Sequence, residues 1–236
     1  MLIFGQISYL VEMEENFGNI SLINGDCLDV MRDMKDKSFS LAIVDPPYGI
    51  GAGDYRRGGT QYGKSITRSK VYERKKWDAK PPTIEYFKEL QRISENQIIW
   101  GANHFISRMP FDASCWVVWD KDNGNNDYAD CELAWTSFKC AVRKFKYKWH
   151  GMFQENMKEK EIRIHPTQKP VALYKWLFSR FANTGDTIID THLGSGSICI
   201  AAHDLGFKML GIELDSQYYQ MAKQRLLYHQ AQLRIF

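Results

Sequence analysis

The chain has 236 residues, of which 44% are hydrophobic and 25% are charged, and its formal net charge is +3. This composition is typical of a soluble globular protein, and the length suffices for one large α/β domain or for one domain with an insertion. The five scattered cysteines form no C-x-x-C pair and the six histidines form no H-x-x-x-H pair, so we expect free thiols in the reducing cytoplasm and no bound metal.

Apolar periodicity and capping residues predict strands that alternate with helices along the chain. Strands are predicted at 19–23, 39–44, 97–100, 114–119, 131–138, 141–149, 187–190 and 208–212, and helices at 27–34, 83–94, 171–181, 197–205 and 216–228. A short helix is expected between residues 103 and 110. This alternation predicts an α/β fold with a doubly wound, mainly parallel sheet. The two strands within 131–149 are expected to form a hairpin or a sheet edge.

The first candidate motif is Asp45-Pro46-Pro47-Tyr48, directly after the buried strand 39–44. Two prolines remove two backbone donors and fix two φ angles, and Pro46 drives Asp45 towards an extended conformation. The result is a stiff corner that presents a carboxylate, a free carbonyl and a ring at the end of a strand. Such a corner suits a flat molecule with an amino group on its edge. The alternative is an ordinary strand-ending turn with a polar tip.

The second candidate motif is a strand, a glycine turn and a helix, within Asp190-Thr191-His192-Leu193-Gly194-Ser195-Gly196. The glycines allow a tight turn and close approach of a ligand to the backbone. The next strand ends near Glu213, and an acid about 20 positions after a glycine loop can accept hydrogen bonds from ribose hydroxyls. Position 199 is cysteine, so the dinucleotide fingerprint is incomplete, which favours a nucleoside-type cofactor. The alternative is an ordinary βαβ turn.

A third motif, His165-Pro166-Thr167-Gln168-Lys169-Pro170, brings several polar side chains together before the predicted helix 171–181. Pro170 fits the first turn of that helix. Taken alone, the motif is as consistent with a simple helix-start loop as with a binding loop.

Two segments are strongly basic, whereas the rest of the chain is acidic. Residues 56–80 hold nine Lys or Arg against two acids, and residues 139–149 hold five and no acid, which leaves the remainder at −9. Aromatic residues interleave with these charges, namely Tyr62, Tyr72, Trp77, Phe145, Tyr147 and Trp149. The pattern favours nucleic-acid binding, because rings can stack on bases beside cations that bind phosphates. The alternative is a pair of solvated loops.

Together, the three motifs resemble the hallmark D-P-P-Y, H-P-T-Q-K-P and D-x-x-x-G-S-G elements of the S-adenosylmethionine-dependent amino-group DNA methyltransferases. The order, with the proline corner first and the glycine turn last, is similar to that of the β-group, and the resemblance covers residues 19–50 and 160–230. It implies one Rossmann-like methyltransferase domain, 1–236, with a small basic loop or hairpin insertion. It also implies S-adenosyl-L-methionine as the cofactor and DNA contacts within 51–150.

The resemblance also implies roles for individual residues. The catalytic residues would be Asp45, Pro46, Pro47 and Tyr48, with Asp45 and the Pro46 carbonyl accepting hydrogen bonds from an exocyclic amine and Tyr48 stacking on a flipped base. Cofactor contacts would come from Asp26, His165, Thr167, Gln168, Lys169, Asp190, Leu193, Gly194, Ser195, Gly196 and Glu213, without a metal. The turn departs from the commoner D-P-F-x-G-S-G form, so we expect Leu193 to supply the apolar contact that phenylalanine gives in relatives.

The resemblance also implies the acceptor, because among relatives aspartate rather than serine before Pro-Pro-Tyr favours N6-adenine over N4-cytosine. The rival hypotheses are an N4-cytosine or RNA-amine methyltransferase, a nucleic-acid-binding protein with a decayed active site, and a Rossmann dehydrogenase. The incomplete glycine fingerprint and the proline corner both disfavour the dehydrogenase. Because β-group relatives are often dimers, the resemblance also implies a homodimer, whereas the sequence identifies no partner restriction nuclease. Without a basic leader or an apolar run of about 18 residues, we expect neither a secretory signal nor a membrane span.

Overall fold

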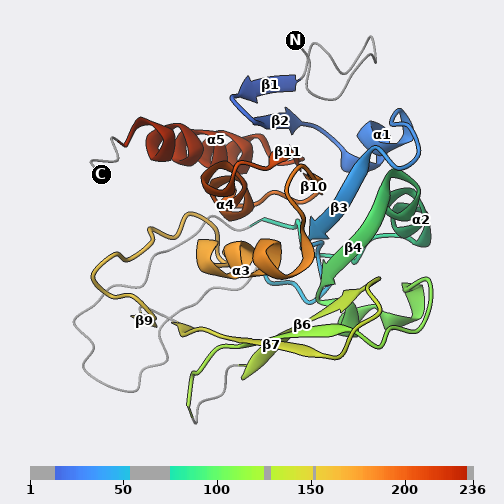
Figure 1. Ribbon diagram of the computed structural model, residues 1–236, viewed down its shortest axis with the longest axis horizontal. Coiled ribbons are helices and arrows are strands. Elements are labelled where there is room, and N and C mark those ends of the chain that lie inside the picture. The colour runs from blue at the N-terminus through green and yellow to red at the C-terminus, as the bar shows by residue number, and fades with distance from the viewer. Residues whose placement is uncertain (1–13, 54–74, 125–128, 151–152, 233–236) are drawn as a thin grey trace.

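The computed structural model describes residues 14–53, 75–124, 129–150 and 153–232. Within these residues, nine strands form one sheet in the order β1-β2-β11-β10-β3-β4-β6-β5-β7 (Figure 1). The strands are β1 Glu14–Phe17, β2 Ile20–Asn24, β3 Phe39–Val44, β4 Ser94–Trp100, β5 Trp116–Asp120, β6 Cys131–Thr136, β7 Arg143–Lys146, β10 Thr187–Asp190 and β11 Lys208–Glu213. A separate pair consists of β8 Trp149–His150 and β9 Phe153–Gln154.

The helices are α1 Cys27–Arg32, α2 Ile84–Ile93, α3 Val171–Phe181, α4 Ser197–Leu205 and α5 Ser216–Ala231. Two short 3₁₀ turns, Ala102–His104 and Ile106–Arg108, stand where the sequence predicts a short helix. Strands β2, β11, β10, β3 and β4 are parallel to one another, while β1 is antiparallel to β2 and β6 is antiparallel to both β4 and β5. The predicted doubly wound, mainly parallel sheet is therefore confirmed.

Of the two alternatives predicted for the strands within 131–149, the sheet edge is confirmed and the hairpin is wrong. Strand β7 pairs with β5 in parallel and forms the sheet edge, and β6 pairs with β4 and β5 instead. Trp149 leaves this sheet and belongs to β8. Alternating residues predict a strand but not its partner, because pairing depends on where the chain returns in space.

Helices cover both faces of the sheet (Figure 1). One core contains residues of α3, α4 and α5, such as Leu177, Ile198 and Leu226, and the other contains residues of α1 and α2, such as Met31 and Phe87. Each of these five side chains is at most 1% exposed.

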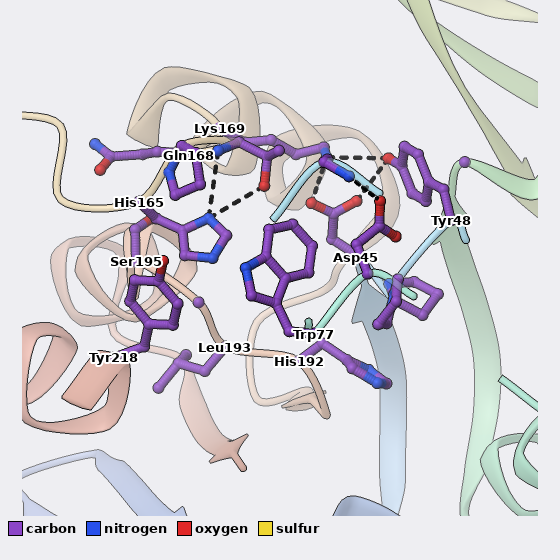
Figure 2. A pocket seen from close by; sticks show the side chains of 18 of the residues that line it. Asp45, Tyr48, Trp77, His165, Gln168, Lys169, His192, Leu193, Ser195 and Tyr218 are labelled. Atoms are coloured by element: carbon purple, nitrogen blue, oxygen red, sulfur yellow. Dashed lines mark hydrogen bonds and ion pairs between the residues drawn. The ribbon is translucent and has the colours of Figure 1, made fainter. Parts of the chain in front are cut away.

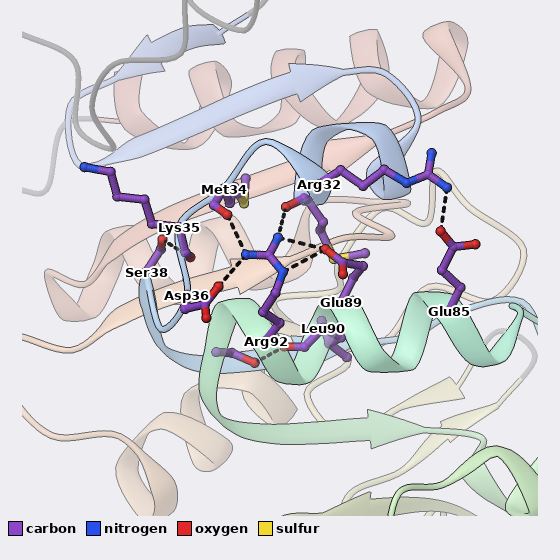
Figure 3. A network of polar contacts seen from close by, with 11 residues as sticks. Arg32, Met34, Lys35, Asp36, Ser38, Glu85, Glu89, Leu90 and Arg92 are labelled. Carbon is purple, nitrogen blue, oxygen red and sulfur yellow. Dashed lines mark hydrogen bonds and ion pairs between the residues drawn. The ribbon is translucent and has the colours of Figure 1, made fainter.

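An arginine ties α2 to the end of α1 (Figure 3). Arg92 donates hydrogen bonds to the carbonyls of Met31 and Met34, at 2.7 and 2.6 Å, and forms ion pairs with Asp36 and Glu89. Arg92 thus adds donors to one carbonyl in the last turn of α1 and to one in the segment that follows it.

The connections diverge at the middle of the sheet. From β10 the chain crosses to β11 on one side, and from β3 it crosses to β4 on the other. Strands β10 and β3 are parallel neighbours, with Ile188 opposite Leu41, so their carboxyl ends open onto the same crevice. Ligands of doubly wound sheets bind at such a switch point, and both candidate motifs follow these two strands.

The prediction of free thiols is wrong for one pair of cysteines. Cys115 and Cys140 form a disulfide, with their Cα atoms 4.8 Å apart, because the start of β5 and the segment after β6 lie side by side. Cys27, Cys131 and Cys199 are free. Among the described helices, none has the length and apolarity that a membrane crossing requires.

Candidate active site

The proline corner and the glycine turn border one cavity of about 1440 Å³. The sequence-predicted residues that line it are Asp26, Asp45, Pro46, Pro47, Tyr48, His165, Thr167, Gln168, Lys169, Leu193, Gly194, Ser195 and Glu213. Asp190 and Gly196 do not line it. Figure 2 shows the corner residues on one side of the cavity, Leu193 and Ser195 on the other, and Trp77 between them.

Asp45 is held in place by two donors. The Tyr48 hydroxyl donates to Asp45 Oδ1 at 2.7 Å, and Lys169 Nζ lies 2.5 Å from Asp45 Oδ2. Lys169 Nζ also lies 3.1 Å from Glu132 Oε2. Burial raises the pKa of Asp45 and the Glu132 carboxylate adds to this rise, whereas Lys169 and Tyr48 oppose it. The corner therefore presents an oriented carboxylate with stronger than usual affinity for a proton.

The ring of Tyr48 lies over a glycine. A Cβ on Gly101 would come within 2.0 to 2.4 Å of three atoms of that ring, and Gly101 has a φ of +69°. His104, which is exposed, stacks on Tyr48 with the ring centroids 5.0 Å apart and the planes 16° apart. The structure thus places a second ring, which the sequence did not single out, against the residue expected to stack on a base.

The glycine turn is held by hydrogen bonds that backbone N–H groups donate to acidic side chains. Gly194 N donates to Glu213 Oε2 at 2.7 Å, and Asp215 N donates to the other oxygen of Glu213 at 2.9 Å. Asp190 accepts from His192 N at 3.0 Å, and burial raises the pKa of Asp190 to about 8. Asp190 thus supports the turn without lining the cavity. A Cβ on Gly196 would lie 3.1 Å from the Cβ of Ala222, so Gly196 allows α5 to pack closely.

His192 and Leu193, where the glycine turn departs from the commoner D-P-F-x-G-S-G form, both pack against other parts of the fold. Leu193 is 4% exposed and packs on β11, where a Cβ on Gly211 would come within 2.9 Å of its side chain. His192 meets the ring of Tyr86 edge-on at 5.2 Å, and burial lowers the pKa of His192 to about 4. His192 is therefore neutral near pH 7, and both residues add apolar or aromatic contacts to the turn.

Three residues of the third motif, 165–170, have different surroundings. Gln168 uses its amide locally, accepting from Ile164 N at 2.9 Å and donating to Ile162 O at 3.3 Å. His165 lies beside the glycine turn, and its ring meets that of Tyr218 at 4.3 Å. Lys169 points to the proline corner.

Asp26 stands at the end of β2 and has two roles. It caps α1 by accepting from Leu28 N at 2.8 Å, as its position in the sequence predicts. It also lines the cavity, and its contact to a cofactor stays a prediction.

Residues 75–78 cross the cavity from the corner to the glycine turn. Asp78 is 2% exposed and accepts from Gly49 N and Ala52 N, both at 2.8 Å. Trp77 lies 5.0 Å from the ring of His165, and Lys75 forms an ion pair with Asp215 at 2.6 Å. This segment therefore connects the proline corner to the half of the cavity that carries the glycine turn.

Nucleic-acid binding by the two basic segments stays a prediction. Residues 56–74, including Tyr62 and Tyr72, lie outside the described residues. In the second segment, Lys144, Lys146 and Lys148 form ion pairs with Asp120 or Asp122. The rings there are also used internally: Phe145 stacks on Tyr147, Phe145 packs on Trp176, and Trp149 is 5% exposed. A net charge counted along the chain overlooks acids supplied by another strand.

Several residues of the cavity were missed by the sequence reasoning. They are Lys75, Trp77, His104, Lys121, Glu132 and Tyr218. In the sequence, Lys75 and Trp77 stand out only as part of the basic, aromatic segment 56–80, and the other four are single polar or aromatic residues without a motif. Their proximity to the predicted motifs arises only from the fold.

His165 gives a testable pH dependence of stability. It is 8% exposed, and burial, assisted by the charge of Lys169, lowers its pKa to about 3 from an ordinary value near 6.5. Below pH 6.5 the unfolded chain binds the proton and the folded chain does not, so folding stability is lost as the pH falls. We expect a loss of about 2 kcal/mol at pH 5 from this group, measured by urea unfolding at pH 7 and pH 5.

A variant isolates this contribution. His165→Gln should lose less stability than the natural chain between pH 7 and pH 5, whereas His203→Gln, in α4, should lose as much. An identical loss in His165→Gln would contradict the assignment.

The fold and the cleft define a Rossmann-like protein with methyltransferase architecture. Structures of similar fold include the M1.HpyAVI–SAM complex, with 23% identity, coverage of 88% of this chain and 100% of that one, and a TM-score of 0.54. Another is PvuII DNA methyltransferase, described as cytosine-N4-specific, with 13% identity, coverage of 89% and 90%, and a TM-score of 0.58.

The sequence profile of the DNA methylase family N6_N4_Mtase matches residues 118–224. Type II methyltransferase M.HinfI of Haemophilus influenzae is 24% identical over 91% of this chain and 70% of its own length. The putative methylase YubD of Escherichia coli (strain K12) is 26% identical over 86% of this chain and 88% of its own. Over residues 118–224 in sequence, and across most of its fold, the chain is similar to N6/N4 DNA methyltransferases, and these matches support the resemblance that its motifs carry.

Proposed function

We propose that this protein transfers a methyl group from S-adenosyl-L-methionine to the N6 amine of an adenine flipped out of DNA. The observation that carries the proposal is the single cavity bordered by both the Asp45 corner and the Gly194 turn. The aspartate that begins the corner supports adenine as the acceptor. Two structures of similar fold are described as S-adenosyl-L-methionine complexes, M1.HpyAVI and a putative DNA modification methylase of Thermus thermophilus.

The glycine-turn half of the cavity fits a nucleoside-type cofactor. Gly194 has a φ of +53°, and a Cβ added there would have no other atom nearer than 3.9 Å, so the backbone is open to close approach by a ligand. Leu193, Trp77 and Tyr218 supply apolar surface, and Glu213 supplies carboxylate oxygens. When bound, S-adenosyl-L-methionine supplies an electrophilic methyl group on its sulfonium.

The proline corner would prepare the acceptor amine. The lone pair of an exocyclic amine is delocalised into the base, so the nitrogen is a poor nucleophile. Asp45 and the Pro46 carbonyl would each accept one N–H, which favours a tetrahedral nitrogen and localises the lone pair. With the cofactor bound, the nitrogen would bond to the methyl carbon as the carbon–sulfur bond breaks, and Asp45 or water would accept the surplus proton. The raised pKa of Asp45 suits this proton acceptance.

Tyr48 would stack on the flipped base. Removing a base from the duplex costs a few kcal/mol, and stacking on an aromatic side chain returns about 1–3 kcal/mol. The base would take the face of Tyr48 on which the exposed His104 now lies.

The acceptor base is the open part of this proposal, because the same corner can bind the N4 amine of cytosine. DNA incubated with the protein and methyl-labelled S-adenosyl-L-methionine should be digested and its nucleosides separated. We expect the label in N6-methyl-2′-deoxyadenosine. Label in N4-methyl-2′-deoxycytidine would replace adenine with cytosine, and label in RNA alone would replace DNA. A protein that binds DNA but not the cofactor would have a decayed site.

The cations at the mouth of the cavity are the proposed contacts to the DNA backbone. Lys76 and Lys80 are exposed and line the cavity, in contrast to Lys144 and Lys146, which pair with acids. We expect Lys76→Gln/Lys80→Gln to weaken DNA binding and to reduce the slope of log affinity against log salt by about 2, since each phosphate that a lysine neutralises adds about 0.9 to that slope. Fluorescence anisotropy titrations at several salt concentrations measure both.

The double variant Lys144→Gln/Lys146→Gln removes the same charge from the outer edge of the sheet. Its slope should change much less. Equal changes in the two double variants would show that Lys76 and Lys80 are not the preferred contacts to the DNA backbone.

A further inference from the structure

Four alternating charges run from the proline corner across the cavity wall: Asp45, Lys169, Glu132 and Lys121. The distances from one to the next are 2.5, 3.1 and 2.5 Å. They come from four separate elements, since Asp45 follows β3, Lys169 precedes α3, Glu132 lies in β6 and Lys121 follows β5. All four line the cavity. The chain of charges is neutral overall, yet only Asp45 belongs to the proposed reaction described so far.

The side chain of Lys169 is buried and enclosed by aromatic rings. The residue is 4% exposed, and its ammonium lies 5.3 Å from the centre of the Trp100 ring and 5.8 Å from that of Tyr48. It is also 3.3 Å from the Tyr48 hydroxyl. A buried ammonium between two carboxylates remains charged, and the pKa of Lys169 is raised by Asp45 and Glu132 against the opposing effect of burial.

Glu132 is likewise fixed as an anion. Burial would raise its pKa, but the ammonium groups of Lys169 and Lys121 hold it at about 2. Glu132 therefore carries its charge throughout the pH range in which the enzyme would be assayed, and it competes with Asp45 for the ammonium of Lys169.

We propose that Lys169 and Glu132 are positioning residues for methyl transfer: Lys169 fixes Oδ2 of Asp45 and leaves Oδ1 to the substrate amine, while Glu132 limits how strongly Lys169 holds that carboxylate. Lys121 in turn limits Glu132. The inference rests on the proposed function, because it assigns these residues to the reaction at Asp45. It also moves Lys169 from the cofactor contacts implied by its motif to the catalytic corner.

The geometry explains why both neighbours matter. Oδ1 of Asp45 accepts from the Tyr48 hydroxyl at 2.7 Å and has a second lone pair for an amine hydrogen. If Lys169 bound Asp45 alone, the carboxylate would be a weaker acceptor and a weaker base. If Lys169 were absent, two buried carboxylates would face each other, and one would bind a proton.

The proposal predicts opposite shifts of the kcat–pH profile for substitutions of Glu132 and of its ion-pair partner Lys121. Glu132→Gln leaves Lys169 to Asp45 alone, so the acidic limb of the kcat–pH profile should move to lower pH by about 0.5 to 1 unit. In Lys121→Gln, Glu132 holds Lys169 more strongly and Lys169 holds Asp45 less strongly. The pKa of Asp45 should rise, and the acidic limb should move to higher pH. Loss of a merely structural contact would not shift the profile in opposite directions.

The other ionisable groups near Asp45 are unchanged in these variants. Tyr48 is in its own corner, Tyr174 lies on α3, and Asp190 ends β10. Their effect on the carboxylate is therefore common to every variant, and differences between profiles report the substituted residue.

The experiment measures methyl transfer to DNA from labelled S-adenosyl-L-methionine between pH 5 and pH 9, with the full chain. For Glu132→Gln we also expect kcat to fall about threefold at its plateau, with the KM for the cofactor unchanged. Lys144→Gln, whose partner Asp120 lies outside the chain of charges, is the matched control and should keep the natural profile. Lys169→Gln should move the acidic limb upward, beyond the shift of Lys121→Gln.

Shifts of Glu132→Gln and Lys121→Gln in the same direction, or no shift in either, would overturn the inference. If Lys169→Gln does not fold, the other two variants still decide it. The natural chain separates this failure from a failure of the proposed function: without methyl transfer by the natural chain, the proposed function itself is wrong.

Discussion

Asp45→Asn should reduce methyl transfer by about 10³-fold or more while changing cofactor affinity only slightly. The amide cannot take up a proton, and its NH₂ group would face either Lys169 or the Tyr48 hydroxyl, which both donate to the carboxylate in the natural chain. Loss of a positioned acceptor and base has an effect of this size. Single-turnover transfer of labelled methyl measures the chemistry, and calorimetry with S-adenosyl-L-methionine measures binding.

Asp29→Asn is the matched control for this variant. Asp29 is an exposed carboxylate on α1 that pairs with Arg32 and does not line the cavity, so its loss should leave turnover unchanged. Retained turnover in Asp45→Asn would rule out the role of Asp45, and a parallel loss of cofactor binding would show that the variant disturbs the whole cavity.

Gly101→Ala should be the second most damaging substitution, although Gly101 contributes no side chain to the chemistry. An added Cβ would collide with the Tyr48 ring at 2.0 to 2.4 Å. The ring must then move, and its hydroxyl would leave Asp45 Oδ1. We expect about a 100-fold fall in turnover and a loss of about 1–3 kcal/mol in the free energy of unfolding from overpacking. Turnover assays and urea unfolding measure the two effects.

Gly18→Ala separates the collision from backbone strain. Gly18 has a φ of +70°, against +69° for Gly101, but a Cβ there would meet nothing within 4 Å. It should lose about 1–2 kcal/mol of stability from the left-handed backbone and keep natural turnover at temperatures where it is folded. If Gly101→Ala turned over as fast as the natural chain, the position of the Tyr48 ring over Gly101 would not be needed for the reaction.

The parts of the fold set by local sequence were predictable. The apolar periodicity of residues 171–181 and the buried run 187–190 gave the bounds of α3 and β10 without error. The proline corner and the glycine turn also stood out, because prolines and glycines impose backbone conformations that need no knowledge of distant neighbours. The doubly wound order then brought the two motifs together at the switch point.

What depends on distant pairing was not predictable. The β7 lysines have no acid beside them in the sequence, and only the fold places Asp120 and Asp122 next to them. Lys169 belonged to a motif assigned to the cofactor, yet its ammonium reaches Asp45, 124 positions earlier in the chain. Glu132 carried no motif at all, and only the pairing of β6 with β4 brings it to the cavity.

The central claim is that the proline corner and the glycine turn serve a single reaction. A crystal structure of the protein with S-adenosyl-L-methionine tests it most directly. An amine that lies about 3 Å from Asp45 Oδ1 and about 3–3.5 Å from the methyl carbon requires that carbon within about 7 Å of Oδ1. We predict a methyl group that points to Asp45 at this range, with the nucleoside against the Gly194 turn. A cofactor bound elsewhere, or a methyl group directed away from Asp45, would contradict the account.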